Sequence, residues 1–249
     1  VYTRRANPTT AILEAKLARL ENGSWCRCFA SGMGAITTTL SALLAVDTHV
    51  VVVNDCYGPT RKYLTTHLAR YGVTTTFVRG TDPTAFVDAL RDETRVIYLE
   101  SPTTGRMDVI ELAPIVAAAR QRGIVTLFDN SWASPYFQRP LELGLDLVLH
   151  SATKYIGGHS DTVGGVVVGR DDTLRQRIVA AGELLGASPD PFAAWLLMRG
   201  LRTLPLRMEQ HQKTGLALAR LLAEHPAVAH VCHPGLPTYP NHAVAGKQM

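Results

Sequence analysis

Residues 124–130 read IVTLFDN, and residues 145–155 read LDLVLHSATKY. Each stretch starts with an apolar run typical of a buried strand and then turns polar, the first at Asp129 and the second at Ser151 and Lys154. Open α/β sheets bind their ligands at the carboxyl ends of their parallel strands. We therefore expect Asp129 and Lys154 to lie at the carboxyl ends of neighbouring strands.

The rest of the chain continues this alternation of strands and helices. Apolar or β-branched runs predict strands at residues 49–53, 96–99, 124–128, 145–149 and 164–168. Helical spacing of apolar residues predicts helices at residues 11–20, 35–44, 83–90, 112–122, 190–202 and 207–224. The alternation predicts an α/β fold with a mostly parallel sheet flanked by helices.

A carboxylate and a lysine placed in this way match what pyridoxal phosphate (PLP) requires. The lysine bonds covalently to the cofactor, and the aspartate keeps the pyridine nitrogen protonated so that the ring withdraws electrons. A free lysine has a pKa of about 10.4, so burial and the covalent bond are expected to lower the pKa of Lys154. The alternatives are a surface lysine at Lys154 and a turn or helix-capping carboxylate at Asp129.

Further motifs, taken in chain order, resemble the Cys/Met-metabolism family of PLP enzymes. This family includes cystathionine lyases and synthases, methionine γ-lyase and homoserine sulfhydrylases. The motifs are YTRRANPT at 2–9, SGMGA at 31–35, YGPT at 57–60, ESP at 100–102, DNSW at 129–132, SATKYIGGHSD at 151–161, RGLRTL at 199–204 and HPGLP at 233–237. The resemblance implies a type I PLP-transferase fold, similar to aspartate aminotransferase, and the cofactor pyridoxal 5'-phosphate.

The resemblance also implies which residues hold the cofactor phosphate. The backbone N–H groups of Gly32 and Met33, at a helix N-terminus, resemble the family's anion donors. Ser151 and Thr153 resemble hydroxyl donors to the same phosphate. The alternative for the glycine-rich stretch is a plain turn from strand to helix.

Three more site residues follow from the family pattern. Tyr2 and Arg4 resemble phosphate ligands that come from the neighbouring subunit, which implies a homodimer or homotetramer with shared active sites. Tyr57 resembles the tyrosine that stacks on the cofactor ring and assists proton transfer. The alternatives are a disordered basic terminus for the first pair and a core or turn tyrosine for Tyr57.

The resemblance suggests three regions in the chain. Residues 1–10 are expected to form an arm that reaches the neighbouring subunit, and residues 11–190 the PLP-binding large domain. Residues 191–249 are expected to form linking helices and the start of a truncated C-terminal domain. The family's arginine for the substrate carboxylate is expected in the missing part, while Arg199 and Arg202 are expected to be structural.

Composition narrows the possible partners. The 249 residues are 46% hydrophobic and 18% charged, with a net charge of +4 that is spread along the chain. This composition predicts an ordered core and argues against nucleic-acid binding. The four cysteines, Cys26, Cys28, Cys56 and Cys232, lack the spacing of a metal site or redox pair and are expected to be free thiols. Without a signal peptide or an apolar stretch of about 18 residues, we expect a cytoplasmic protein that does not bind membranes.

The motifs favour a carbon–sulfur lyase but leave the reaction open. Thr104 stands where many relatives have an asparagine near the cofactor ring. Pro59 and Trp132 resemble the residues found at these positions in cystathionine β-lyases. The predicted activity is therefore β-elimination, which releases a thiol, pyruvate and ammonia. His150-Ser151 and the proline-rich loop near the end of the chain resemble the corresponding segments of the family's γ-specific enzymes. The alternative activity is therefore γ-elimination or γ-replacement. A third possibility is a PLP module of a larger protein that is non-catalytic or acts on a tethered substrate.

Overall fold

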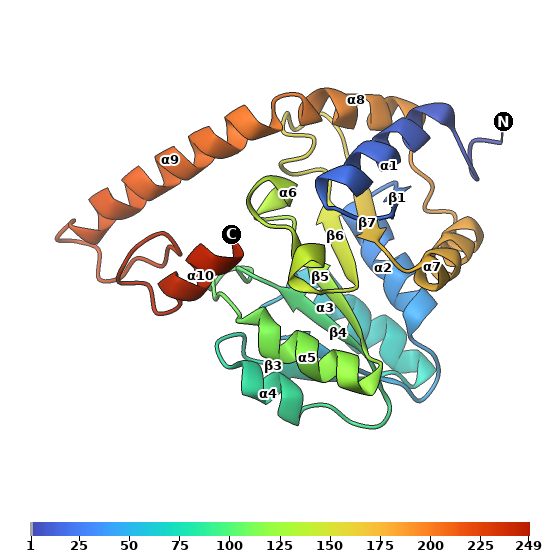
Figure 1. The fold of residues 1–249 in the computed structure, drawn as a ribbon, viewed down its shortest axis with the longest axis horizontal. Helices are drawn as coiled ribbons and strands as arrows, with labels where there is room; N and C mark the ends of the chain where they lie inside the picture. The colour runs from blue at the N-terminus through green and yellow to red at the C-terminus, as the bar shows by residue number, and fades with distance from the viewer. Residues whose placement is uncertain (1) are drawn as a thin grey trace.

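A seven-stranded sheet in the order β1-β7-β6-β5-β4-β2-β3 crosses the computed structural model, which describes residues 2–249 (Figure 1). The pairs β2–β3, β2–β4, β4–β5 and β5–β6 are parallel, whereas β7 is antiparallel to β1 and β6. The predicted mostly parallel α/β sheet is therefore confirmed. The strands are β1 (Trp25–Phe29), β2 (His49–Val53), β3 (Thr74–Val78), β4 (Thr94–Glu100), β5 (Val125–Asp129), β6 (Leu147–Ser151) and β7 (Gly165–Gly169).

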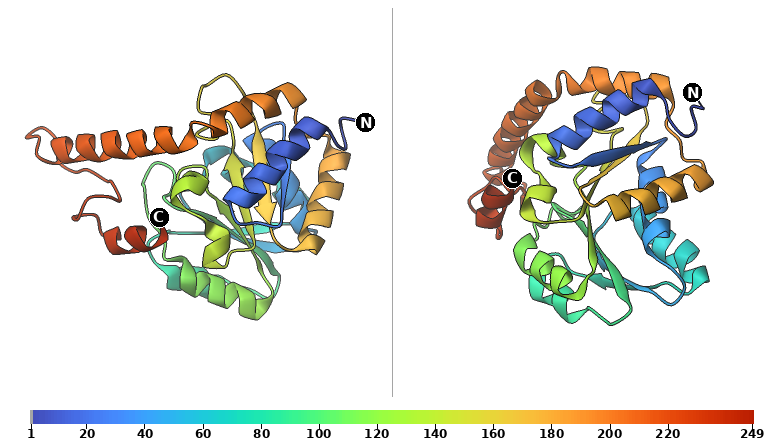
Figure 2. Two further views of the ribbon diagram at one scale, coloured as in Figure 1. Left: turned by 45° about the horizontal axis from the view of Figure 1, so that its top comes forward. Right: turned by 45° about the vertical axis from the view of Figure 1, so that its right-hand side comes forward.

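Helices cover both faces of the sheet (Figure 2). The helix α2 (Gly32–Leu43) packs against β6, β7 and α7 (Asp172–Leu185). The helix α5 (Leu112–Arg122) packs against β5 and α4 (Pro83–Asp88). The other helical segments are α1 (Pro8–Leu20), α3 (Gly58–Lys62), η1 (Tyr63–His67), η2 (Leu68–Tyr71), α6 (Ser134–Phe137), η3 (Pro140–Leu143), α8 (Pro191–Leu201), α9 (Leu204–Ala223) and α10 (His242–Gln248).

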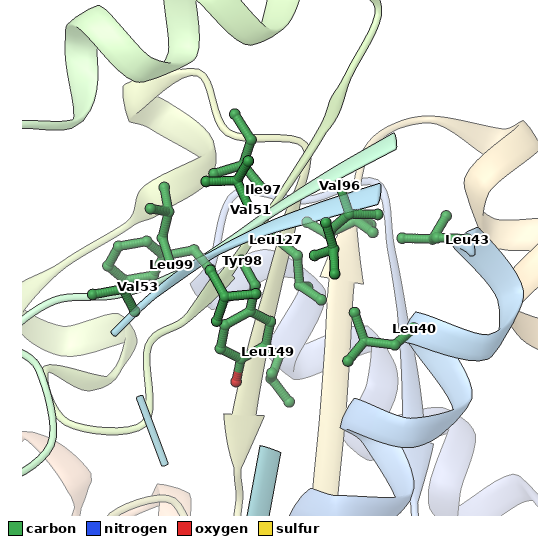
Figure 3. Packing of buried hydrophobic residues seen from close by; sticks show 14 of the residues in the cluster. Leu40, Leu43, Val51, Val53, Val96, Ile97, Tyr98, Leu99, Leu127 and Leu149 are labelled. Atoms are coloured by element: carbon green, nitrogen blue, oxygen red, sulfur yellow. The ribbon is translucent and has the colours of Figure 1, made fainter. Parts of the chain in front are cut away.

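The central strands are buried along their whole length. All five residues of β2 are buried. Val51 of β2 stands beside Ile97 of β4 on one face of the sheet, and Tyr98 of β4 stands beside Leu127 of β5 on the other face (Figure 3). Each buried aliphatic side chain of this kind contributes about 1.5–3 kcal/mol to folding. Since helices shelter both faces, the ends of the strands are the places where polar side chains can meet a ligand.

The C-terminal segment packs back on the connection between β4 and α5. After the long helix α9, which projects away from the sheet, the chain returns to α10 (Figures 1 and 2). Tyr239 Oη donates to the Met107 carbonyl oxygen at 2.7 Å and accepts from the Val109 N–H at 2.9 Å. These bonds anchor residues after 235 on the sheet unit, and the domain boundary at 190/191 stays a prediction. No helix between residues 2 and 249 is long and apolar enough to cross a membrane.

Candidate cofactor site

Asp129, the last residue of β5, carries a carboxylate that is held on both oxygens. The residue is 7% exposed. Ser131 donates to Oδ1 through its N–H at 3.0 Å and its hydroxyl at 2.6 Å, and Tyr98 Oη donates to Oδ2 at 3.2 Å. A carboxylate offers about four lone-pair sites, so these bonds leave it able to accept another. Asp129 is thus fixed in place and can still accept a bond from a ring N–H.

Ser131 joins the turn after β5 to the end of β6. While its hydroxyl donates to Asp129, the same oxygen accepts from the Ser151 N–H at 2.7 Å. The Asn130 N–H also donates to the Leu149 carbonyl oxygen at 2.9 Å. The structure therefore brings the Asp129 and Ser151 segments together at neighbouring strand ends through direct hydrogen bonds.

Lys154 lies in the turn that follows β6. The Lys154 N–H donates to the Ser151 carbonyl oxygen at 3.0 Å, and the Lys154 carbonyl oxygen accepts from Gly158 at 2.7 Å. Its ammonium group has no hydrogen bond or ion pair with residues 2–249, and the residue is exposed. The expected burial of Lys154 is therefore not found, because the turn faces outward in this chain. The amine is free to react with a ligand.

The start of α2 approaches the end of β6 closely. A Cβ atom on Gly32 would lie 2.9 Å from Ser151 Oγ, so a side chain at this position would fill the gap. Ser31 caps α2 by accepting from the Gly34 N–H at 2.9 Å. The N–H groups of Gly32 and Met33 have no partner in the described part of the chain and lie at the positive end of the helix dipole. Together with the Ser151 hydroxyl they form an arrangement suited to an anion.

Thr153 makes a different set of contacts. Its hydroxyl donates to the Gly164 carbonyl oxygen at 3.2 Å and accepts from the Gly164 N–H at 3.1 Å. In this structure the hydroxyl closes the turn between Thr153 and Gly164. Its role as a phosphate ligand stays a prediction.

Tyr57 lies at the same edge, beside a second carboxylate. Tyr57 is 44% exposed, and its N–H donates to Glu100 Oε2 at 2.9 Å. Glu100 ends β4 directly opposite Asp129 in the β4–β5 ladder, and the Thr104 hydroxyl donates to its Oε1. Burial, together with the charge of Asp129, raises the pKa of Glu100 to about 7.

Tyr2 and Arg4 lie on the outer surface of the chain. Arg4 Nε donates to Tyr2 Oη at 3.1 Å, and Arg4 Nη1 donates to the Glu183 carbonyl oxygen of α7 at 2.5 Å. Their side chains form no hydrogen bond with Asp129, Lys154 or the start of α2. The segment just before α1 lies near α7 (Figure 1). The structure therefore leaves these two predicted ligands outside their own chain's cofactor site.

The family model for Cys/Met metabolism PLP-dependent enzymes matches residues 1–249. The chain belongs to this family. It is 44% identical over 248 residues to a probable cystathionine gamma-synthase of Herpetosiphon aurantiacus, covering 100% of this chain and 77% of the relative. It is 41% identical over 252 residues to an L-methionine gamma-lyase of Treponema denticola, covering 100% of this chain and 63% of that protein. A cystathionine beta-lyase of Coxiella burnetii is 42% identical over 250 residues, with 100% of this chain and 64% of that protein covered.

Solved structures agree with this assignment. The metB protein of Corynebacterium glutamicum superposes with a TM-score of 0.98 at 38% identity, covering 100% of this chain and 64% of that one. The cystathionine gamma-lyase of Lactobacillus plantarum, complexed with L-serine, gives a TM-score of 0.97 at 40% identity, covering 100% of this chain and 65% of that one. The chain thus spans less than two thirds of the length of several of its relatives.

The residues at the strand ends fit PLP, the cofactor of this family. Asp129 can accept one more hydrogen bond, Lys154 offers a free amine, and the start of α2 offers N–H groups beside the Ser151 hydroxyl. Ser131, Tyr98 and Glu100 were not predicted from the sequence to be site residues. Ser131 and Glu100 lie within the quoted motifs at 129–132 and 100–102, and Tyr98 is hidden in the apolar run of β4.

Proposed function

We propose that this chain forms most of a PLP-dependent enzyme that cleaves a carbon–sulfur bond in an amino acid. The observation that carries the proposal is a fixed, buried Asp129 at the end of β5 together with a free Lys154 amine in the turn after the adjacent strand β6. When bound, PLP supplies an electron sink for the charge that develops at the substrate Cα. Asp129 keeps the ring nitrogen protonated, while Lys154 anchors the cofactor and carries the Cα proton.

The other predicted residues bind and orient the cofactor. We assign the phosphate to the N–H groups of Gly32 and Met33 and the hydroxyls of Ser151 and Thr153, and the face of the ring to Tyr57. Tyr2 and Arg4 are proposed to complete the phosphate site of a neighbouring subunit in a homodimer or homotetramer. Their surface position on α7, outside their own chain's site, supports that sharing.

Two forms of the reaction have separate support. Pro59 and Trp132 favour β-elimination, as in cystathionine β-lyases. The relatives named cystathionine gamma-synthase, at 44% identity, favour γ-replacement. Both reactions need the same proton transfer by Lys154 and the same ring protonation by Asp129, so these residues do not separate them.

Replacing Lys154 tests the proposal directly. Lys154→Ala should remove the covalent bond to PLP, seen as loss of visible absorption and of cofactor retained after borohydride reduction and denaturation. Lys213→Ala, which removes an exposed lysine on α9, should leave both signals unchanged. Retention of the covalent cofactor in Lys154→Ala would contradict the assignment.

Product analysis then identifies the reaction. With cystathionine, pyruvate indicates β-elimination and 2-oxobutyrate indicates γ-elimination. With an O-acylhomoserine and cysteine, cystathionine indicates γ-replacement. If the PLP-loaded protein, assayed as its natural full-length chain, yields none of these products, the proposed activity fails and a module that acts on a tethered substrate or does not catalyse becomes the better description.

A further inference from the structure

Glu100 is a buried carboxylate that no predicted role accounts for. It is 8% exposed and occupies the last position of β4, opposite Asp129 of β5. Both of its oxygens accept hydrogen bonds, Oε2 from the Tyr57 N–H at 2.9 Å and Oε1 from the Thr104 hydroxyl. One side chain thus connects the ends of β2 and β4 through the segments that follow them.

Tyr57 depends on this carboxylate for its position. It precedes the short helix α3 as its N-cap, and its side chain makes no capping hydrogen bond. Its carbonyl oxygen accepts from the Thr60 N–H at 3.0 Å, so α3 holds the carbonyl side of the residue. The N–H side is held by Glu100. Tyr57 is 44% exposed, so its side chain is only partly packed, and the two backbone hydrogen bonds contribute to its position.

Burying a carboxylate to accept these two hydrogen bonds costs desolvation free energy that a neutral acceptor would not cost. Besides Asp129, the buried residues Tyr98 and Cys56 lie near Glu100, and burial raises the pKa of Cys56 to about 12. The site is therefore poorly solvated and already holds one negative charge. A charged acceptor gives stronger hydrogen bonds than a neutral one, and such costly arrangements are concentrated at functional sites.

We propose that Glu100 is a positioning residue that sets Tyr57 over the cofactor ring, with Thr104 as the second anchor of its carboxylate. Glu100 acts through the Tyr57 backbone and does not touch the reacting atoms. In the β4–β5 ladder Glu100 stands beside Asp129. The ends of these adjacent strands would therefore position two groups for the cofactor ring, Asp129 directly and Tyr57 through Glu100. This inference rests on the proposed function, because it takes Tyr57 as the ring-stacking residue.

The test compares Glu100→Ala with Glu100→Gln. Amide hydrogen exchange of Tyr57 is measured in the PLP-loaded protein, together with the visible absorption of the cofactor, kcat and KM. Glu100→Ala should speed exchange at Tyr57 by about tenfold or more, as expected for the loss of a hydrogen bond to a charged group. It should also alter the absorption spectrum and raise KM. Glu100→Gln keeps an acceptor oxygen, so its Tyr57 exchange rate, absorption spectrum and KM should stay close to those of the wild type. Glu93→Ala is the matched control, because Glu93 is an exposed glutamate in the turn just before β4, and it should leave exchange at Tyr57, the spectrum, kcat and KM unchanged.

A double variant separates positioning from a merely structural role. If Glu100 acts through Tyr57, Tyr57→Ala should reproduce the spectral and KM changes, and Glu100→Ala in that background should add little. Unchanged exchange at Tyr57 in a folded Glu100→Ala protein would overturn the proposal. Faster exchange with a wild-type spectrum and KM would also overturn it, because Glu100 would then only cap α3. If the wild-type protein fails to bond PLP through Lys154, the proposed function fails, while the exchange measurement still decides whether Glu100 holds Tyr57.

Discussion

Two regions of the chain are proposed to bind the cofactor: the turns after β5 and β6, and the arm at residues 2–5. They differ in how firmly hydrogen bonds and burial fix their side chains. In the turns, the Ser131 hydroxyl lies between Asp129 and the Ser151 N–H, with bonds of 2.6 and 2.7 Å. In the arm, Tyr2 is 63% exposed, and Arg4 bonds mainly to Tyr2 and to α7.

The difference indicates which part of the site one chain can build. Residues locked by packing and hydrogen bonds are preorganised for binding, so the turns need no partner to hold their geometry. A chain terminus becomes ordered when other groups tie it down, and the arm's contacts lie at the surface. We therefore expect substitutions in the turns to affect chemistry and stability strongly, and substitutions in the arm to affect cofactor retention weakly.

The largest effect is expected at Asp129. Asp129→Ala removes the group that keeps the ring nitrogen protonated, and we expect kcat/KM to fall about a thousandfold, which corresponds to roughly 4 kcal/mol. Asp82→Ala is the control, since Asp82 is an exposed cap of α4 that accepts from the Thr84 N–H at 2.9 Å. Steady-state kinetics on both variants would check this, and near-normal turnover by Asp129→Ala would reduce Asp129 to a turn residue.

The next effect concerns pH. The folded-state pKa of Glu100 is raised from 4.5 to about 7, so ionising this carboxyl favours unfolding. The Glu100 carboxyl contributes its full stabilisation below its pKa in the unfolded chain, and this stabilisation is lost as the pH rises through about 7. We expect the wild type to lose roughly 2.5 kcal/mol relative to Glu100→Gln between about pH 5 and about pH 8. Urea unfolding at both pH values measures this difference, and parallel pH profiles for the two proteins would contradict it.

Two hydroxyls allow a direct comparison of the turns with the arm. Ser131→Ala removes the oxygen shared by Asp129 and Ser151, and we expect PLP to bind about tenfold more weakly, or about 1.4 kcal/mol. Ser188→Ala removes the hydroxyl that donates to the Arg4 carbonyl oxygen at 2.8 Å, and we expect a smaller loss. Titration of both proteins with PLP provides the measurement, and equal losses would remove the distinction between turns and arm.

The sequence predicted the parts of the fold that have strong periodicity. The runs at 49–53, 124–128 and 145–149 correspond to β2, β5 and β6, with ends that shift by a few residues. β3 was missed because its sequence TTTFV is rich in threonine and only its last residue is buried. α7 was missed because most of its residues are polar or partly exposed, with Ile178 and Gly182 its buried positions.

In the site, too, local sequence patterns predicted only some of the residues. The positions of Asp129 and Lys154 after neighbouring strands could be predicted, because a polar residue after an apolar run indicates a strand end. The parts played by Tyr98 and Glu100 depend on the pairing of β4 with β5, which places Glu100 opposite Asp129. Such register between strands is set by tertiary packing, and no local pattern in one strand encodes it. Ser131 is a similar case, because its bond to Ser151 crosses between two segments distant in sequence.

The smallest effect is expected in the arm. Arg4→Ala should weaken PLP retention severalfold, because Arg4 is one of several groups proposed to bind the phosphate and the others stay in place. Arg5→Ala is a matched control, since Arg5 carries the same charge one residue away and pairs with Glu183 at 3.6 Å. Dialysis of the loaded proteins would compare them, and equal retention by the two variants would contradict a specific role for Arg4.

Mixing subunits tests whether the arm acts across an interface. Lys154→Ala subunits lack the reactive amine but carry an intact Arg4, and Arg4→Ala subunits carry the reverse. If sites are shared, a mixed dimer has one site with both lesions and one site with neither. At PLP concentrations too low to saturate Arg4→Ala, mixing should then raise the activity per Arg4→Ala subunit. If each chain supplies its own Arg4, the mixed dimer gains no intact site and activity stays at the Arg4→Ala level. Mass spectrometry of the mixture shows whether subunits have exchanged, so an unchanged activity after exchange would assign Arg4 to its own chain or to the surface alone.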